Sequence, residues 1–250
     1  MTFYSNLKAD IYKIFHTPLW PIHMVIPVIG IVLFVWYDSF SPWKEENKLS
    51  TYIQVLSIVF PILIGIITSI LAETEEKAGE FQMLLTTEKG KYIPHIGKLV
   101  SLILFGFASA FLALAGFGIG FMRIGYTTFS LLFYVKTAVL LVLSVIPLYV
   151  LEYMVSFLFG KGFGIGIGIV GGLLSALLLT GLGDEIWWYL PWGIAARFSE
   201  GLLRSSLSNT KFFQYKGIME STMCIFLFSL IFMVLLILIF NKWEGRTPED

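Results

Sequence analysis

Long runs of apolar residues, separated by polar stretches, dominate the chain. About 20 apolar residues in a helix cross the ~30 Å hydrocarbon core of a membrane, so each run of this length predicts a membrane-spanning helix. The sequence contains six such runs, which cover residues 20–37, 52–71, 99–121, 133–159, 164–182 and 222–240. We therefore predict an all-α integral membrane protein, with one transmembrane domain over residues 1–250.

Prolines modify this picture in two of the spans. Pro147 lies within 133–159, where it can kink the helix or divide it into two shorter elements. Pro21 and Pro27 make the first span the least regular.

The pattern of residues 1–17 predicts an amphipathic interfacial helix. A cleavable signal is not expected there, because the charges are spread along the stretch and no small-residue cleavage site follows a short apolar core.

The polar stretch after the second span, AETEEKAGEFQMLLTTEKGK, is strongly acidic. Five glutamates fall between Glu73 and Glu88. Each would cost about 2.5–3.5 kcal/mol at the centre of a membrane helix, so this segment lies outside the lipid. Its apolar residues return at helical spacing while Glu73, Glu76 and Glu80 line another side, which predicts an amphipathic helix over 73–86. These apolar residues are Ala78, Phe81, Leu84 and Leu85.

Two interpretations fit this acidic helix. It can lie on the lipid headgroups, or it can present its polar face to a soluble partner. The glutamates disfavour the first, because anionic lipids repel them and interfacial helices are usually rich in Lys and Arg.

The distribution of basic residues predicts the orientation of the chain. Six spans place both termini on one side. With the termini inside, nine Lys and Arg residues lie inside and eight outside, and four of the outer ones fall in the long segment 183–221. Without that segment the ratio is nine to four, which favours cytoplasmic termini in a cell membrane.

Composition excludes several classes of protein. With 57% hydrophobic and 14% charged residues, the chain lies outside the range of soluble proteins. Its net charge is zero, so no basic surface predicts binding to nucleic acid. The single cysteine, Cys224, lies in an apolar run without a disulfide partner.

The segment ETEEKAGEFQMLLTTEKGKYIPHIGKLV resembles the corresponding segment of lantibiotic immunity permeases, which belong to the ABC type-2 transporter permeases. The shared features are a Glu-rich stretch, a Gly, an aromatic residue, a Gln and a Leu pair ahead of a basic run. The matching residues are Glu75, Glu76, Gly79, Phe81, Gln82, Leu84 and Leu85. Six spans, an amphipathic N-terminal helix and re-entrant-looking material over 183–221 extend the resemblance to nearly the whole chain.

The resemblance implies the permease subunit of a transporter in a Gram-positive cell membrane. In such systems two related permeases pair with a homodimeric ATPase that binds ATP and Mg, and the complex expels lantibiotic peptide from the membrane. The helix at 73–86 would be the coupling helix, with Phe81 and Leu84 filling an apolar pocket of the ATPase. Its coupling residues would be Glu73, Glu75, Glu76, Gly79, Glu80, Phe81, Gln82, Leu84 and Leu85.

The chain itself lacks the sequence motifs of an ATPase. Its Gly-Lys pairs have no glycine at the upstream position of a phosphate-binding loop. A Gly-x-Gly-x-x-Gly string at Gly166 lies in an apolar span with no preceding strand, so we interpret it as a chance match. We expect no enzymatic activity and no cofactor in this chain.

Glycines spaced by four residues predict close helix packing in the fifth span, although they would also allow it to bend. These glycines are Gly160, Gly164, Gly168 and Gly172.

In the fourth span, Glu152 has two interpretations. It can lie in a substrate or proton path, or the span can end near Val150 and leave Glu152 at the interface, which we favour.

The segment 183–221 contains the aromatic sequence IWWYLPW and then an amphipathic helix. We favour an interfacial belt for the aromatic residues, and the alternative is contact with a cationic peptide substrate. In the helix, Ile194, Phe198, Leu202 and Leu203 form one face, opposite Arg197, Glu200 and Arg204. The substrate-path candidates are Glu152, Trp187, Trp188, Trp192 and Phe198.

His16, His23 and His95 lack the spacing of metal ligands, and no hydrolase triad is recognisable.

Two classes of function stay open. The first is a permease subunit, for a lantibiotic or for another lipid, drug or peptide. The second is a non-transporting membrane assembly or sensor protein whose acidic helix docks a partner.

Overall fold

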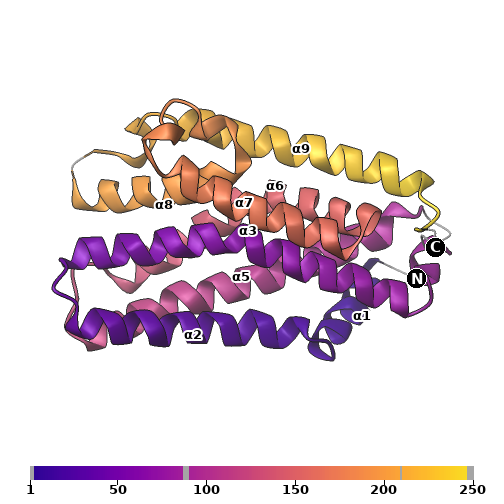
Figure 1. Cartoon of the computed structure of the whole chain (residues 1–250), viewed down its shortest axis with the longest axis horizontal. Coiled ribbons are helices and arrows are strands. Elements are labelled where there is room, and N and C mark those ends of the chain that lie inside the picture. The colour runs from indigo at the N-terminus through magenta and orange to yellow at the C-terminus, as the bar shows by residue number, and fades with distance from the viewer. Residues whose placement is uncertain (1–2, 87–89, 209, 247–250) are drawn as a thin grey trace.

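The apolar runs fold into long helices that lie side by side in an elongated bundle (Figure 1). The computed structural model describes residues 3–86, 90–208 and 210–246. Within these ranges no strand occurs, and six helices are long and apolar enough to cross a membrane, which confirms the predicted number. They are α2 (Leu19–Phe40), α3 (Glu45–Lys77), α5 (Tyr92–Arg123), α6 (Leu131–Phe159), α7 (Lys161–Leu178) and α9 (Ile218–Lys242).

Three further α-helices lie at the ends of the bundle. They are α1 (Phe3–Phe15), α4 (Gln82–Leu85) and α8 (Pro191–Leu207), and short 3-10 turns flank α8. The labels for the two chain ends lie at the same end of the bundle, next to the turn that follows α3 (Figure 1). We call this the terminal end, and the opposite end, where α8 lies, the distal end.

Several helices are longer than the apolar runs that predicted them. Helix α3 begins at Glu45 rather than at residue 52, and α6 continues unbroken through Pro147, so the chain does not divide there. Helix α7, by contrast, ends at Leu178, before the predicted residue 182. An apolar run marks the part of a helix that lipid can cover. Polar helical turns can extend beyond it where other groups or water pair with the backbone N–H and C=O groups at the helix end.

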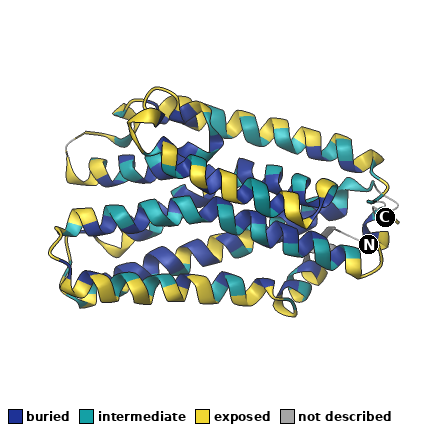
Figure 2. Cartoon of the chain, in the orientation of Figure 1, coloured by how far each residue is buried: buried dark blue, intermediate teal, exposed yellow. Residues whose placement is uncertain are grey.

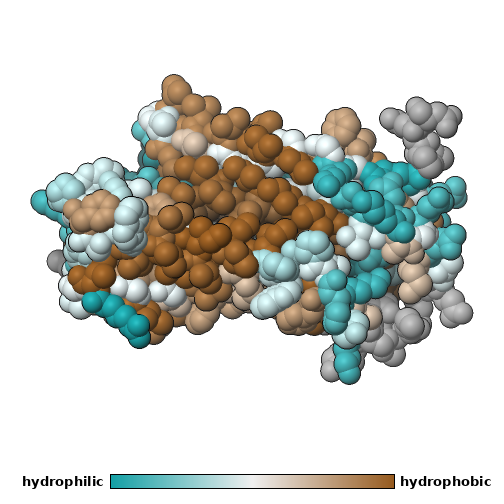
Figure 3. Space-filling model, turned by 60° about the horizontal axis from the view of Figure 1, so that its bottom comes forward, coloured by the Kyte–Doolittle hydropathy of each residue, from teal (hydrophilic) through white to brown (hydrophobic). Residues whose placement is uncertain are grey.

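Helix α6 forms the centre of the bundle and contacts α3, α5, α7, α8 and α9. Helices α2 and α9 are peripheral, and they expose large apolar side chains such as Trp36 and Phe226 (Figure 2). On the face shown in Figure 3, apolar side chains cover the middle of the molecule, and hydrophilic side chains gather towards its two ends. This distribution matches a hydrocarbon layer between two aqueous phases.

Glycines bring α3 and α7 into close contact, as their spacing predicts. A Cβ atom added at Gly65 of α3 would lie 2.6 Å from the backbone oxygen of Gly164 and 2.9 Å from the Cα of Gly168. At Gly172 it would lie 3.0 Å from the backbone oxygen of Ile58. Gly160 differs, because it lies between α6 and α7 with a φ of 91°, a left-handed conformation that favours glycine.

We expect Gly65→Ala to lower the thermal unfolding temperature of the protein in detergent, because the added methyl group meets backbone atoms that cannot move aside independently. The expected loss of stability is about 1–3 kcal/mol. Gly166→Ala is the matched control, since its Cβ would meet nothing within 4 Å. Equal unfolding temperatures for the two variants would contradict the close approach of α3 and α7.

Candidate functional site

The acidic residues at the end of α3 each pair with a different part of the bundle. Glu73 accepts hydrogen bonds from Lys161 of α7 and Lys77, both at 2.8 Å. Glu76 pairs with Arg246, beyond the end of α9. The stretch that interrupts the apolar sequence therefore joins elements of the terminal end to one another.

Glu75 belongs to a buried ion cluster between α1, α3 and α5. The Lys98 Nζ lies 2.7 Å from Glu75 Oε1 and 2.8 Å from Asp10 Oδ1, and Lys13 reaches Glu75 at 3.2 Å. Lys98 and Glu75 are each 4% exposed. Burial raises the pKa of the Asp10 carboxyl above its ordinary value, and the Lys98 ammonium opposes that shift. Each charge in the cluster depends on the others to offset its desolvation.

Three consecutive residues after α3 adopt left-handed backbone conformations. The φ angles are 127° at Gly79, 50° at Glu80 and 65° at Phe81. Such a conformation costs a residue with a side chain about 1–2 kcal/mol, so surrounding contacts must hold Glu80 and Phe81 in place. The turn carries Phe81 into the core, where its ring centroid lies 4.9 Å from that of Trp243. The short helix α4 follows directly.

The predicted continuous helix over 73–86 is therefore wrong. Helix α3 ends at Lys77, because the left-handed turn has to deliver Phe81 to the interior. Phe81 and Leu84 are 1% and 2% exposed, so they are not free to fill a pocket of another protein. Glu75 is equally unavailable to a partner, being buried with Lys98. Glu88, the last glutamate of the stretch, lies outside the described residues.

Fewer side chains of this segment are exposed than the sequence predicted. Its exposed side chains include those of Glu80, Gln82 and Met83, and Met83 is 66% exposed. We call residues 77–83 the exposed turn. Beside it lies a hollow of about 570 Å³, whose lining consists of Glu76, Lys77, Gly79, Glu80, Phe81, Gln82 and Arg246.

Glu152 lies inside the bundle and not at its surface. It is 0% exposed, α6 continues beyond it to Phe159, and neither carboxyl oxygen has a hydrogen-bond partner among the described residues. The helix therefore does not end near Val150, and Glu152 is enclosed by protein rather than exposed at a surface. One helical turn later, Ser156 contacts the hydroxyls of Thr68 at 2.9 Å and Ser69 at 3.2 Å. Glu152 thus lies one turn from a polar contact between α3 and α6.

The aromatic candidates at the distal end fold inward. Trp187, Trp188 and Phe198 are 6%, 8% and 5% exposed, and they form one apolar cluster with Ile194 and Ile218. An interfacial belt would expose the tryptophans to lipid, so that favoured interpretation fails for Trp187 and Trp188. Their rings instead pack inside a small unit formed by α8 and the segments on either side of it, residues 181–218.

Trp192 occupies a different position. Its backbone oxygen accepts a hydrogen bond from Ser175 Oγ, and its indole ring packs against Gly171 of α7. The predicted faces of the amphipathic helix are present in α8, where Ile194 and Phe198 are buried and Arg204 is exposed. Trp192 therefore joins α7 to α8.

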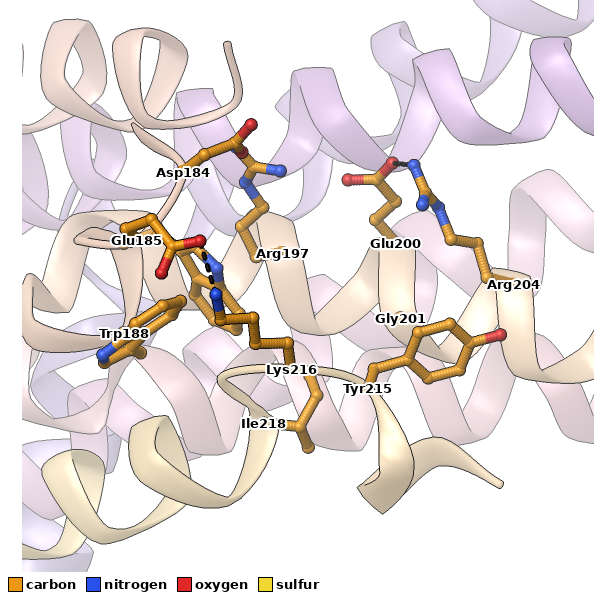
Figure 4. A pocket seen from close by; sticks show the side chains of 11 residues that line it. Asp184, Glu185, Trp188, Arg197, Glu200, Gly201, Arg204, Tyr215, Lys216 and Ile218 are labelled. Atoms are coloured by element: carbon orange, nitrogen blue, oxygen red, sulfur yellow. Dashed lines mark hydrogen bonds and ion pairs between the residues drawn. The ribbon is translucent and has the colours of Figure 1, made fainter. Parts of the chain in front are cut away.

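A pocket of about 270 Å³ opens beside this unit (Figure 4). We call it the distal pocket, and its lining consists of Asp184, Glu185, Trp187, Trp188, Arg197, Glu200, Gly201, Arg204, Tyr215, Lys216 and Ile218. Three ion pairs lie in this lining, namely Arg197–Asp184 at 2.8 Å, Arg204–Glu200 at 2.5 Å and Lys216–Glu185 at 2.5 Å. Glu152 does not belong to it.

The structure thus separates the predicted residues into two regions. The coupling candidates gather at the terminal end, and the aromatic candidates Trp187, Trp188 and Phe198 at the distal end. Sequence reasoning missed Asp10 and Lys98 as partners of Glu75. One signal was present, since Lys98 directly precedes a predicted span. In the part of the chain that is described, no group of three His, Cys, Asp or Glu side chains could hold a metal ion.

Comparisons of the chain with protein-family models, curated proteins and solved structures found no match. A shared fold would not by itself establish function in any case, because function resides in particular sites. The function is therefore inferred from the geometry of the two ends, together with the sequence resemblance.

We expect Lys98→Met to lower the free energy of unfolding by about 3–5 kcal/mol, because it removes the shared cation from two buried carboxylates. Lys77→Met is the control. It breaks only the pair with Glu73, in which Lys77 is 74% exposed, so it should cost less than about 1 kcal/mol. Unfolding by SDS in mixed micelles measures both values, and similar losses would argue against a buried cluster.

Proposed function

We propose that the protein is the membrane-spanning permease subunit of an ABC transporter, powered by a separate ATPase. The observation that carries this proposal is the exposed turn, which directly follows α3, together with the ion pairs that tie the last turns of α3 to other helices. A partner that moves this turn would also move α1, α5 and α7, because Glu73 and Glu75 are bonded to them. Rigid attachment of this kind suits the transmission of force.

The side chains of the exposed turn suit contact with a soluble protein. Glu80 supplies a carboxylate, Gln82 an amide, and Met83 a flexible thioether that adapts to a partner surface. In this proposal the terminal end faces the cytoplasm, in agreement with the basic residues of the short loops. The partners would be a homodimeric ATPase, which holds ATP and Mg, and a second related permease.

The proposed substrate is a lantibiotic, a cationic peptide expelled from the membrane to give self-immunity. This part of the proposal depends on the sequence resemblance around the acidic stretch. Of the residues that carry it, Gly79 and Phe81 build the turn and Glu75 anchors it. The resemblance therefore supports a shared coupling geometry more directly than a shared substrate.

The double substitution Glu80→Lys and Met83→Glu should abolish co-purification of the ATPase and peptide resistance. It changes only exposed side chains of the turn, so the unfolding temperature should stay the same. Glu46→Lys, an exposed charge reversal at the start of α3, is the control and should leave both properties intact. Normal ATPase binding by the double variant would exclude the exposed turn as the docking surface.

Deletion of the gene should lower the resistance of the cells to the lantibiotic and leave more peptide bound to them. Minimum inhibitory concentration and cell-bound peptide measure the two effects. If resistance is unchanged while the ATPase still co-purifies, the substrate is another lipid, drug or peptide. If no ATPase co-purifies and no neighbouring gene encodes one, a membrane assembly or sensor protein is the better interpretation.

A further inference from the structure

The distal pocket has a composition that the proposed coupling role does not explain. Its lining contains three acidic residues, Asp184, Glu185 and Glu200, and three basic residues. The basic residues are Arg197, Arg204 and Lys216. Because the charges balance, a simple anion or cation would meet as much repulsion as attraction there. A ligand that carries both signs would meet complementary groups.

The charged groups are placed on two sides of the distal pocket. Figure 4 shows Glu185 and Lys216 on one side, and Glu200 and Arg204 on the other. The pair of Lys216 and Glu185 is largely exposed, with side-chain exposures of 69% and 66%, whereas in the other pair Arg204 is 64% exposed and Glu200 only 19%. Exposed pairs of this kind contribute little to stability, so their members can exchange partners with a ligand at low cost.

The backbone holds part of this lining in place. Glu185 has a φ of 72°, in the left-handed region, which directs the chain around the mouth of the pocket. Gly217 has a φ of 85°, and a Cβ there would lie 2.4 Å from the Trp188 ring. The Lys216 Nζ lies 5.8 Å from the centroid of that ring, a cation–π distance. Lys216 is thus placed by a close contact between backbone and aromatic ring.

The distal pocket adjoins the start of α9, a helix that exposes apolar side chains on a face next to the buried Ile218. Helix α9 begins at Ile218, within the lining, and continues as an apolar spanning helix. Its first turns expose Met219, Met223 and Phe226 by 62%, 71% and 73%. These positions recur at helical spacing on one face, alongside which an acyl chain can lie. A polar pocket beside an apolar helix face matches the amphiphilic shape of a phospholipid.

We propose that the distal pocket binds the headgroup of a phospholipid in which a phosphate is joined to a primary ammonium, with its acyl chains along α9. The phosphate would take hydrogen bonds from Lys216 on one side of the pocket, and the ammonium would donate to Glu200 on the other. The charge-assisted bonds of the free pocket are replaced by bonds of the same kind. This inference does not depend on the proposed transport function.

The test is native mass spectrometry of the full-length protein in detergent, with added phosphatidylethanolamine, phosphatidylcholine or phosphatidylglycerol of identical acyl chains. Phosphatidylethanolamine should bind about tenfold more tightly than the other two. Only its headgroup has both a phosphate that accepts hydrogen bonds and an ammonium with N–H groups that donate them. Lys216→Gln and Glu200→Gln should each remove most of this preference. Glu46→Gln, an exposed substitution outside the lining, should retain it.

Equal binding of phosphatidylethanolamine and either other lipid would overturn the proposal, as would a preference that survives both pocket substitutions. Soluble glycerophosphoethanolamine distinguishes the source of the headgroup. If it binds as tightly as the lipid, the ligand is a soluble phosphoamine and the lipid assignment is wrong. If a cationic amphiphilic peptide binds instead, with a dependence on Glu200 that the lipids lack, the pocket is a peptide site and the proposal also fails.

Discussion

The pairing of Lys98 with Glu75 and Asp10 is the constraint on which the terminal end depends. A single ammonium group contacts two buried carboxylates, and Lys13 gives Glu75 a second, more exposed partner. Because the three residues come from α5, α3 and α1, the cluster fixes the end of α3 against α1 and α5. The strained turn at Glu80 and Phe81 directly follows this fixed end of α3, and the contacts of the Phe81 ring with Phe157 and Trp243 compensate its left-handed conformations.

Hydrophobic pattern was sufficient to predict the six spans, because the thickness of the hydrocarbon layer sets a length that any spanning helix must reach. The spacing of Gly164 and Gly168 likewise predicted a close helix contact, although it could not identify α3 as the partner. A periodic pattern specifies a face of a helix. Which other helix covers that face depends on tertiary packing, to which distant residues such as Gly65 contribute.

The prediction failed where tertiary contacts override local preference. Helical spacing placed Phe81 on the apolar face of a continuous helix, but contacts with Trp243, which lies 162 positions later in the sequence, reverse the chain at this point. Glu152 was assigned to the interface because a carboxylate inside a membrane span normally needs a partner or water. The two tryptophans were assigned there because tryptophan commonly anchors a span at the interface, but it also packs inside proteins. Composition alone does not distinguish the two environments.

The length of α7 has a consequence for the surrounding bilayer. At 18 residues, α7 is about 27 Å long, slightly less than the ~30 Å thickness of a typical hydrocarbon core. Its neighbour α3, with 33 residues, is far longer. The bilayer beside α7 can thin to match it, or flanking residues such as Lys161 can reach to the headgroups, at a cost of a fraction of a kcal/mol per Å of mismatch. The protein would then partition into thinner regions of membrane and deform thicker ones around this helix.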